Sequence, residues 1–401
     1  MIEASGPFDL GRLPRVTFGR GRIRELPAIV AGHGRHALLV TGRHSFRRSA
    51  HHAPLLDALA AAGVGVNELS LEAGEPSPDL VDDAVEQFRD RGIDVVVGIG
   101  GGSVLDAAKA IAGLLMATTT AMDHLEGVGR GLGYEGPAVP FVAVPTTAGT
   151  GSEATRNAVL SRRGSDGFKK SFRDERLVAR DAVVDPDLLM GLDTRRIADN
   201  GMDALAQLIE SFTSTRASPI TDAMALRGLR AVRAGLVPWF DAVSAGRDDA
   251  DARSNMALAA LLSGMTLANT GLGSVHGLAS PLGARFDVGH GAACGATLLA
   301  ATRVNLDALE SRDQDGPGLR RYAEVGRVLS GRDGSESAAL GALLDTLEGL
   351  AARLDIRPLS QFGVGEADIP GVVGEARGTS MRTNPISLTD TEVEEILRAS
   401  L

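Results

Sequence analysis

The segment IDVVVGIG (93–100) constrains the fold more than any other, because it reads as a strand that is apolar on both faces. Such a strand must be covered on both sides, which is typical of a parallel sheet with helices on each face. The residues that follow, GGSVLDAAKAIAG (101–113), have the apolar spacing of a helix. A second buried strand is predicted at AVPFVAVPT (138–146), so strand and helix alternate in this part of the chain.

The alternation extends over about the first 190 residues and then stops. Further strands are predicted at RVTFG (15–19), HALLVTG (36–42) and ARDAVVDPDLL (179–189). DLVDDAVEQFRDRG (79–92) predicts an amphipathic helix capped by Asp79. From Thr194 onward the sequence has helical periodicity without clear strands. We therefore predict an α/β domain over residues 1–190 and an all-helical domain over residues 191–401.

Composition excludes several classes of protein. The formal net charge is −10, from 41 lysines and arginines against 51 aspartates and glutamates, so no nucleic-acid partner is expected. The sequence has no run of eighteen apolar residues and no N-terminal basic and apolar signal, so we expect neither a membrane span nor export. The single cysteine, Cys294, excludes an intramolecular disulfide and a cysteine-rich zinc site. We expect a cytoplasmic protein, since a lone thiol suits a reducing compartment.

A glycine-rich turn joins the first buried strand to its helix. Glycines 100–102 let a phosphate approach the backbone, and the helix that begins near Ser103 offers free N–H groups. The turn predicts a pyrophosphate site, although its spacing differs from the GxGxxG fingerprint and a purely structural turn has the same composition. Asp106 and Lys109 lie on the same helix, either within reach of a nucleotide or as a surface ion pair.

A hydroxyl-rich turn, PTTAGTGSEAT (145–155), ends the second buried strand. Its hydroxyl groups can donate hydrogen bonds to the phosphate or ribose of a ligand. The alternative is an ordinary turn without a ligand, in which hydroxyl residues are also common. Ligands of open α/β sheets bind at the carboxyl edge of the strands, where both turns are expected.

Two of the eight histidines, His276 and His290, lie in the weakly charged segment GLGSVHGLASPLGARFDVGHG (271–291). Burying an imidazole without a partner is costly, so a shared metal ion is a candidate explanation. Asp203, in the apolar helix MDALAQLI, is the candidate third ligand. An Asp/His/His set leaves a coordination position open, as catalysis requires.

The order and spacing of these motifs resemble those of the iron-containing (group III) alcohol dehydrogenase family. The resemblance spans GGGSVLDAAK, PTTAGTGSEAT, DPDLL, GMDALAQLIE, VHGLASPLG and TNPISLTDTEVEEIL, and thus nearly the whole chain. The family is related to glycerol dehydrogenase, maleylacetate reductase and dehydroquinate synthase. The resemblance implies a dinucleotide-binding α/β domain, a helical domain, and NAD(P)-dependent oxidation of alcohols, larger pathway intermediates included, or reduction of carbonyls.

The resemblance also assigns individual residues. The family's pyrophosphate turn and the helix after it fall on Gly100, Gly101, Gly102, Ser103, Asp106 and Lys109. Its hydroxyl-rich turn, which lines nucleotide and nicotinamide, falls on Thr146, Thr147, Thr150 and Ser152. Its metal ligands fall on Asp203, His276 and His290.

Two family histidines are absent here. Gln207 replaces a metal-ligating histidine, and Ser280 replaces the histidine beside the nicotinamide. Glutamine is a poorer ligand for a transition metal than imidazole, so Gln207 either binds the metal weakly or hydrogen-bonds the substrate. Ser280 cannot act as an acid or base at neutral pH, but its hydroxyl can pass a proton along a water or ribose chain. We expect a divalent metal, either Fe²⁺ or Zn²⁺.

Gly42, at the end of the second predicted strand, bears on coenzyme choice. Family members selective for NAD often carry an acidic residue there, whereas Gly42 is followed by Arg43. Without a carboxylate to repel a 2′-phosphate, and with the guanidinium of Arg43 nearby, NADP is a candidate coenzyme beside NAD.

Several alternatives stay open. One is a metal-free reductase similar to maleylacetate reductase, and another is oxidation of a β-hydroxy acid whose keto product decarboxylates in a specialised pathway. A dehydroquinate synthase-like lyase and a non-catalytic binding protein are more remote. The family resemblance also implies a homodimer, for which RVTFG is the candidate edge strand.

Overall fold

The computed structural model describes residues 6–162 and 167–401. These residues form two compact units. One unit comprises Gly11–Thr147 and Gly151–Met190, and the other comprises Gly191–Leu401 together with Ala148–Thr150 and the described residues up to Leu10. The main change of unit, after Met190, lies where strands give way to helices.

The α/β unit is built on a six-stranded parallel sheet with the strand order β1-β8-β5-β4-β2-β3. Its strands are β1 (Arg15–Phe18), β2 (His36–Gly42), β3 (Gly65–Leu71), β4 (Val95–Gly100), β5 (Phe141–Pro145) and β8 (Asp181–Val184). The predicted parallel sheet is confirmed, including the two central strands β4 and β5, which are buried at every position.

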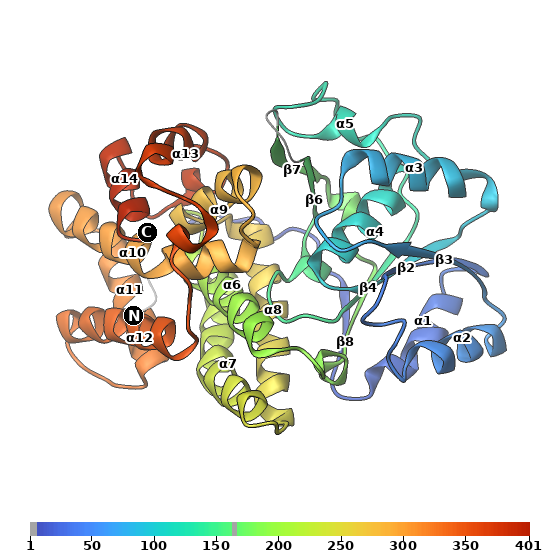
Figure 1. The fold of residues 1–401 in the computed structure, drawn as a ribbon, viewed down its shortest axis with the longest axis horizontal. Coiled ribbons are helices and arrows are strands. Elements are labelled where there is room, and N and C mark those ends of the chain that lie inside the picture. Colours follow the sequence, from blue (N-terminus) through green and yellow to red (C-terminus); the bar gives the residue numbers. More distant parts are fainter. Residues whose placement is uncertain (1–5, 163–166) are drawn as a thin grey trace. The chain divides into compact units, whose positions relative to one another are not determined.

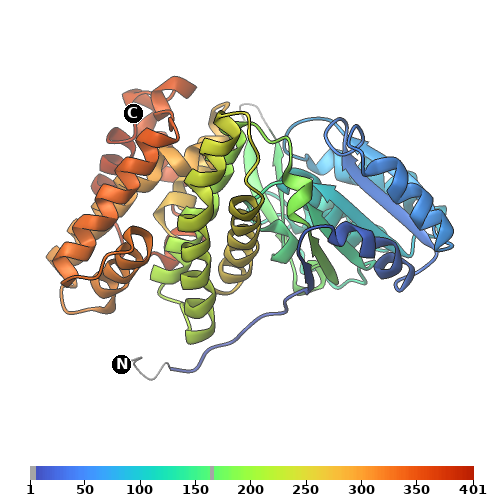
Figure 2. The same ribbon diagram turned by 90° about the horizontal axis from the view of Figure 1, so that it is seen from below.

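Helices cover both faces of this sheet, as Figures 1 and 2 show. They are α1 (Leu26–Ala31), α2 (His52–Ala61), α3 (Pro78–Phe88) and α4 (Gly102–Leu114), and the short α5 (Ala121–His124) packs against α3. Alternation along β2 explains the two layers: Leu38 and Val40 belong to the core shared with α3 and α4, whereas Ala37 and Leu39 belong to the core shared with α1 and α2.

Two local features differ from the sequence prediction. Ser77, and not Asp79, caps α3, because its hydroxyl accepts a hydrogen bond from the amide of Leu80 at 3.1 Å while Pro78 occupies the first turn. An antiparallel pair, β6 (Asn157–Arg162) and β7 (Phe168–Arg173), was not predicted. Its strand FKKSFR is largely polar and buries only the two phenylalanines.

The strand order creates a switch point between β2 and β4. The chain leaves β2 for β3 at one edge of the sheet and then crosses back to β4 on the other side of β2. Thr41 pairs with Ile99, and Gly100 pairs with Pro145, so the carboxyl ends of β2, β4 and β5 lie side by side. This edge is where open α/β sheets bind ligands.

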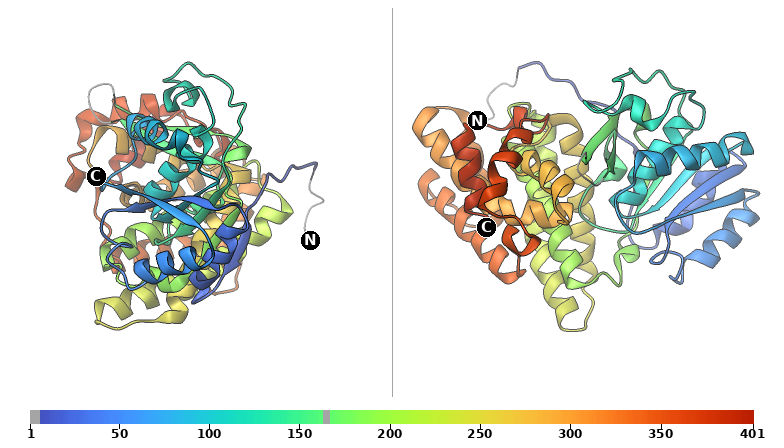
Figure 3. Two further views of the ribbon diagram at one scale, coloured as in Figure 1. Left: turned by 90° about the vertical axis from the view of Figure 1, so that its right-hand side faces the viewer. Right: turned by 45° about the horizontal axis from the view of Figure 1, so that its top comes forward.

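The helical unit contains α6 (Thr194–Thr213), α7 (Pro219–Ser244), α8 (Ala250–Thr270), α9 (Ser274–Arg285), α10 (His290–Arg312), α11 (Pro317–Ser330), α12 (Glu336–Arg353), α13 (Ile369–Glu375) and α14 (Asp390–Arg398). Every residue of α6 from Gly201 to Thr213 is buried, so this helix forms the core of the unit and contacts α7, α8 and α10. Figure 3 shows the C-terminal α13 and α14, in red, beside α9 and α10.

Within residues 6–162 and 167–401, no single helix is long and apolar enough to cross a membrane. Only α8 and α9 taken together reach that length and composition, and they are bent by 99°.

Candidate active site

Four side chains that could hold a metal ion converge inside the helical unit. Asp203 comes from α6, His276 from α9, and His290 and Cys294 from the first turns of α10. Each offers one ligand atom, and all four atoms lie within 4.8 Å of one another. The oxygen Oδ1 of Asp203 lies 3.2 Å from Nε2 of His276 and 3.8 Å from Nε2 of His290. The structure thus brings the three predicted ligands together from positions up to 87 residues apart, 203 to 290.

Glu210 holds His276 in place from behind. Its carboxylate accepts a hydrogen bond from Nδ1 of His276 at 2.6 Å and another from the amide of Val275 at 2.7 Å. A histidine fixed through Nδ1 presents its Nε2 lone pair to a metal ion. Gly273 allows this close approach, because a Cβ there would lie only 2.9 Å from Oε1 of Glu210.

Gln207 lies one turn after Asp203 and is buried, but its amide is already used within the protein. Its Nε2 donates to Oδ1 of Asp203 at 2.9 Å, and its Oε1 accepts from the hydroxyl of Ser263 at 2.7 Å. In this orientation the amide nitrogen faces the carboxylate, and a nitrogen that donates cannot ligate a cation. Gln207 therefore orients Asp203.

Cys294 and Glu210 were missed by the sequence reasoning. Cys294 is fully buried, and its Sγ lies 3.7 Å from Nε2 of His276 and 4.0 Å from Nε2 of His290. Only their spacing in the sequence could have indicated these two residues. Cys294 follows His290 by four residues and Glu210 follows Asp203 by seven, so each pair lies on one face of a helix.

For Asp203 and His276, burial and the neighbouring groups act on the side-chain pKa in opposite directions. Burial alone would raise the pKa of Asp203, but His290 and His276 outweigh it and hold that pKa below its usual range. Burial would lower the pKa of His276, but Cys294 and Glu210 raise it well above its usual value. Burial raises the pKa of the Cys294 thiol to about 11.

The group fits a divalent cation by its donor chemistry. A carboxylate, two imidazoles and a thiol lie together, and the carboxylate supplies the negative charge that a cation requires. His290 departs from the expectation of two buried histidines, because 26% of its side chain is exposed. Ser280, one turn after His276 on α9, is half-buried.

The predicted coenzyme-binding residues gather at the switch point of the α/β unit. Gly42 ends β2, and the glycines at 100–102 lead from β4 into α4. Thr146 donates its amide to the carbonyl of Gly100 at 2.9 Å, which joins the hydroxyl-rich turn to the glycine-rich one. A Cβ at Gly101 would lie 3.2 Å from the side chain of Thr147, so glycine lets the two turns pack closely.

The hydroxyl-rich turn is divided between the two units. Thr146 and Thr147 belong to the α/β unit, whereas Thr150 packs with the helical unit. Ser152 returns to the α/β unit, where its hydroxyl donates to Oδ1 of Asp106 at 2.5 Å.

Lys109 is buried and holds the end of this turn together. Its ammonium donates to the carbonyl and hydroxyl of Ser152, at 2.9 and 3.0 Å, and to the hydroxyl of Thr155 and the carbonyl of Asn157, at 3.0 and 2.6 Å. Asp106 lies 3.7 Å away. The structure therefore places Lys109 as an internal brace for the turn, and its burial contradicts the alternative of a solvent-exposed ion pair.

Glu153 is a further buried acid that the sequence reasoning did not single out. Only 3% of it is exposed. Burial outweighs the opposing effect of the Lys109 charge and raises the pKa of Glu153 to about 7.

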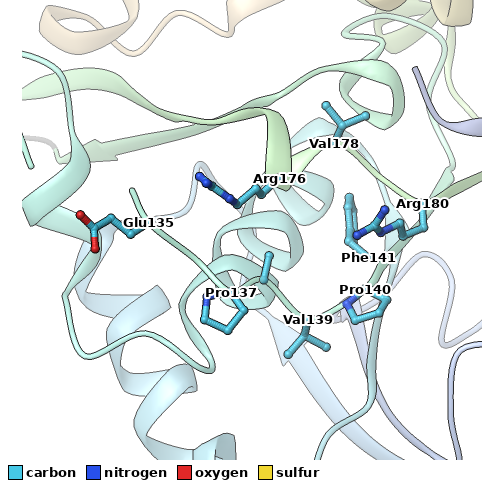
Figure 4. A pocket seen from close by; sticks show the side chains of 9 residues that line it. Glu135, Pro137, Val139, Pro140, Phe141, Arg176, Val178 and Arg180 are labelled. Atoms are coloured by element: carbon cyan, nitrogen blue, oxygen red, sulfur yellow. The ribbon is translucent and has the colours of Figure 1, made fainter. Parts of the chain in front are cut away.

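A separate hollow of about 440 Å³ lies in the α/β unit, shown in Figure 4. Its lining includes Pro140 and Phe141 at the start of β5 and Arg180 just before β8. These positions mark the amino ends of the strands, opposite the carboxyl edge where the two turns meet. The hollow is thus distinct from the predicted coenzyme site.

Comparison with protein families places both halves of the chain. Residues 14–186 match the family model "Iron-containing alcohol dehydrogenase", and residues 197–401 match "Fe-containing alcohol dehydrogenase family, C-terminal".

Characterised proteins are similar over most of the chain. Alcohol dehydrogenase 4 of Schizosaccharomyces pombe is 35% identical over 82% of this chain and 74% of its own length. The 1,3-propanediol dehydrogenase of Citrobacter freundii is 34% identical over 91% of both chains. Among solved structures, 1,3-propanediol oxidoreductase superposes with a TM-score of 0.88 at 29% identity, covering 99% of this chain and 100% of its own. Sulfoacetaldehyde reductase from Bifidobacterium kashiwanohense in complex with NAD⁺ superposes with a TM-score of 0.84 at 27% identity, covering 99% of both.

Proposed function

The chain belongs to the iron-containing alcohol dehydrogenase family, and we propose that it transfers a hydride between an alcohol, or its carbonyl product, and a nicotinamide coenzyme with the help of a divalent metal ion. It is an oxidoreductase that acts on the CH–OH group. The family uses NAD(P) and a metal. The relatives act on different alcohols and aldehydes by name, and we propose a small alcohol or carbonyl substrate.

The convergence of Asp203, His276 and His290 is the observation that carries this proposal. A divalent cation held by these residues would supply Lewis-acid stabilisation for the negative charge that develops on the substrate oxygen, while NAD(P) takes up the hydride. Asp203 contributes negative charge, and each histidine contributes one ring nitrogen. Glu210 keeps Nε2 of His276 turned toward the other donors.

The remaining polar residues have distinct roles in this proposal. Gln207 orients Asp203 by donating to its Oδ1, so it acts on the reaction only through that carboxylate. Ser280 lies one helical turn from His276, and we assign its hydroxyl to passing the alcohol proton toward solvent or the coenzyme ribose.

The coenzyme is assigned to the carboxyl edge of the sheet. The N-terminus of α4, with glycines 100–102 and Ser103, would take the pyrophosphate, and Thr146 and Thr147 would contact the nucleotide from the neighbouring turn. We propose that NADP is accepted, because Gly42 puts no carboxylate at the end of β2. Arg43, which follows, is an exposed residue paired with Glu72, and such a pair is weak enough to be exchanged for a phosphate.

Metal analysis combined with a coenzyme-reduction screen against a panel of alcohols tests the proposal. The purified protein is expected to contain a divalent metal and to reduce NAD or NADP with at least one alcohol. His290→Ala is expected to abolish both the bound metal and turnover. Turnover that survives this substitution and chelation would instead support a metal-free reductase, for which the internally bonded Gln207 is the favouring observation.

Assembly and location complete the proposal. β1 is an edge strand, as predicted, and we propose that the enzyme is a homodimer in which this edge lies at the interface. We also propose a cytoplasmic location, where the lone thiol of Cys294 would stay reduced. Light scattering of the purified protein and fractionation of the cells that make it test these two points.

A further inference from the structure

Cys294 lies where a metal ligand would be expected. A cysteine on a buried helix face usually packs as a small apolar side chain. Its Sγ instead lies 3.7 Å from Nε2 of His276 and 4.0 Å from Nε2 of His290, the ring nitrogens that also face Asp203. The sulfur therefore completes a ring of donors from α6, α9 and α10.

The distances suit a shared four-coordinate ion. Zinc bonds of about 2.0–2.3 Å to nitrogen, oxygen and sulfur place neighbouring tetrahedral ligand atoms about 3.3–3.6 Å apart. Four of the six separations are 3.2, 3.7, 3.8 and 4.0 Å, and all six are within 4.8 Å. The four atoms thus lie close enough together to be candidate ligands of one ion.

The fourth imidazole of the family is missing at the same time. Gln207 stands at its position, and both ends of its amide are engaged, one with Asp203 and the other with Ser263. A bonded amide thus stands at the position of the family's nitrogen ligand on α6, while a sulfur donor lies on α10.

We propose that Cys294 is the fourth protein ligand, so that the metal centre is an Asp203/His276/His290/Cys294 site selective for zinc over iron. Binding replaces the S–H bond by a sulfur–metal bond and releases the proton to solvent. Thiolate is a soft ligand and favours Zn²⁺ over harder cations such as Fe²⁺ and Mn²⁺. Zinc can expand to five-coordinate, which leaves room for the substrate oxygen beside four protein ligands. This inference rests on the proposed metal-dependent function.

Cobalt substitution tests the ligand directly, without reference to turnover. The full-length protein is stripped of metal with a chelator and reloaded with Co²⁺, whose bond to a thiolate gives a near-ultraviolet charge-transfer band. Cys294 is the only cysteine in the sequence, so such a band can have no other protein source. We expect the band in the unaltered protein and its loss in Cys294→Ser loaded with the same Co²⁺.

Metal selectivity provides the second measurement. Competition with chelators is expected to show that Cys294→Ser lowers Zn²⁺ affinity at least about tenfold while Mn²⁺ affinity changes much less. Cys294→Ala, which adds no oxygen, should give the same loss for zinc. If either variant does not fold, the cobalt spectrum of the unaltered protein still decides.

The outcomes separate this inference from the proposed function. A cobalt-loaded protein without the band, or Cys294 variants with unchanged preference for Zn²⁺ over Mn²⁺, would overturn the cysteine ligand alone, provided that His290→Ala still abolishes metal binding. A protein that takes up no divalent cation at all would overturn both.

Discussion

Glu210 and His276 are joined by a 2.6 Å hydrogen bond between the carboxylate oxygen Oε2 and the ring nitrogen Nδ1. The other oxygen of the same carboxylate accepts the amide of Val275, so Glu210 fixes both the start of α9 and the direction of the His276 ring. A carboxylate behind a metal-binding histidine sets which nitrogen carries the proton and makes the other a better ligand. The bond therefore connects the packing of α6 and α9 with the chemistry proposed for the metal centre.

Glu210→Gln is expected to weaken metal binding by about 10–100-fold, because the neutral amide retains the shape but not the charge behind His276. Zn²⁺ affinity measured by chelator competition checks this expectation. Glu375→Gln serves as the control, since Glu375 forms a half-exposed ion pair with Arg285. Equal Zn²⁺ affinity in Glu210→Gln and the unaltered protein would show that the carboxylate has only a structural role.

Lys109→Met is expected to destabilise the protein by about 3–5 kcal/mol, because it removes one partner of a buried charge pair and leaves its acceptors unsatisfied. The losses include the bonds to Ser152, Thr155 and Asn157 and the charge opposite Asp106. Urea unfolding measures the change in free energy. Lys170→Met, at an exposed position of β7, should lie within about 0.5 kcal/mol of the unaltered protein. A Lys109→Met variant as stable as Lys170→Met would contradict the bracing role.

The sequence predicted those parts of the molecule whose signal is local. β4 and β5 are continuous apolar runs, and α4 follows β4 directly, so the sheet and its carboxyl edge were predictable. The segment that became α9 carries Gly277, Pro281 and Gly283, which hide its helical character, and it forms because Glu210 and Asn384 accept its first amides. These partners lie 65 and 110 residues away in the chain.

The same distinction holds at the metal centre. Asp203, His276 and His290 were predictable because they combine unusual residue types with the family's spacing. Cys294 lies close to His276 only because α10 packs against α9. The amide of Gln207 is held partly by a hydrogen bond from Ser263 of α8. Spacing places Cys294 on the same helix face as His290, but it does not predict the contacts with α9 or α8, because both arise from packing between helices.

Glu153 predicts how stability should vary with pH. Its pKa of about 7 in the folded protein exceeds the ordinary value of 4.5, so between these two values the folded state holds a proton that the unfolded state has released. Stability should therefore fall as pH rises through this window, and the full loss, about 3 kcal/mol at about 1.4 kcal/mol per pKa unit, is present above pH 7.

Glu153→Gln cannot ionise and should escape this loss. Urea unfolding of both proteins at pH 5 and pH 8 is expected to show the variant gaining stability, relative to the unaltered protein, at the higher pH. Groups common to both proteins cancel in this difference. Parallel pH profiles for the two proteins would mean that Glu153 is charged throughout or reaches solvent.

Gly42→Asp is expected to turn coenzyme preference away from NADP. A Cβ at this position would meet nothing closer than 3.7 Å, and its backbone has no positive φ, so aspartate fits without strain. Its carboxylate at the end of β2 would accept a hydrogen bond from the ribose 2′-hydroxyl of NAD and repel the 2′-phosphate of NADP. The ratio of kcat/KM for NADP to that for NAD should fall at least about tenfold, corresponding to about 1.4 kcal/mol.

Gly42→Ala, which adds bulk without charge, should leave the ratio nearly unchanged. A strong preference of the unaltered protein for NAD would show that Gly42 does not select the coenzyme, and that the 2′-phosphate is excluded by other residues at this edge.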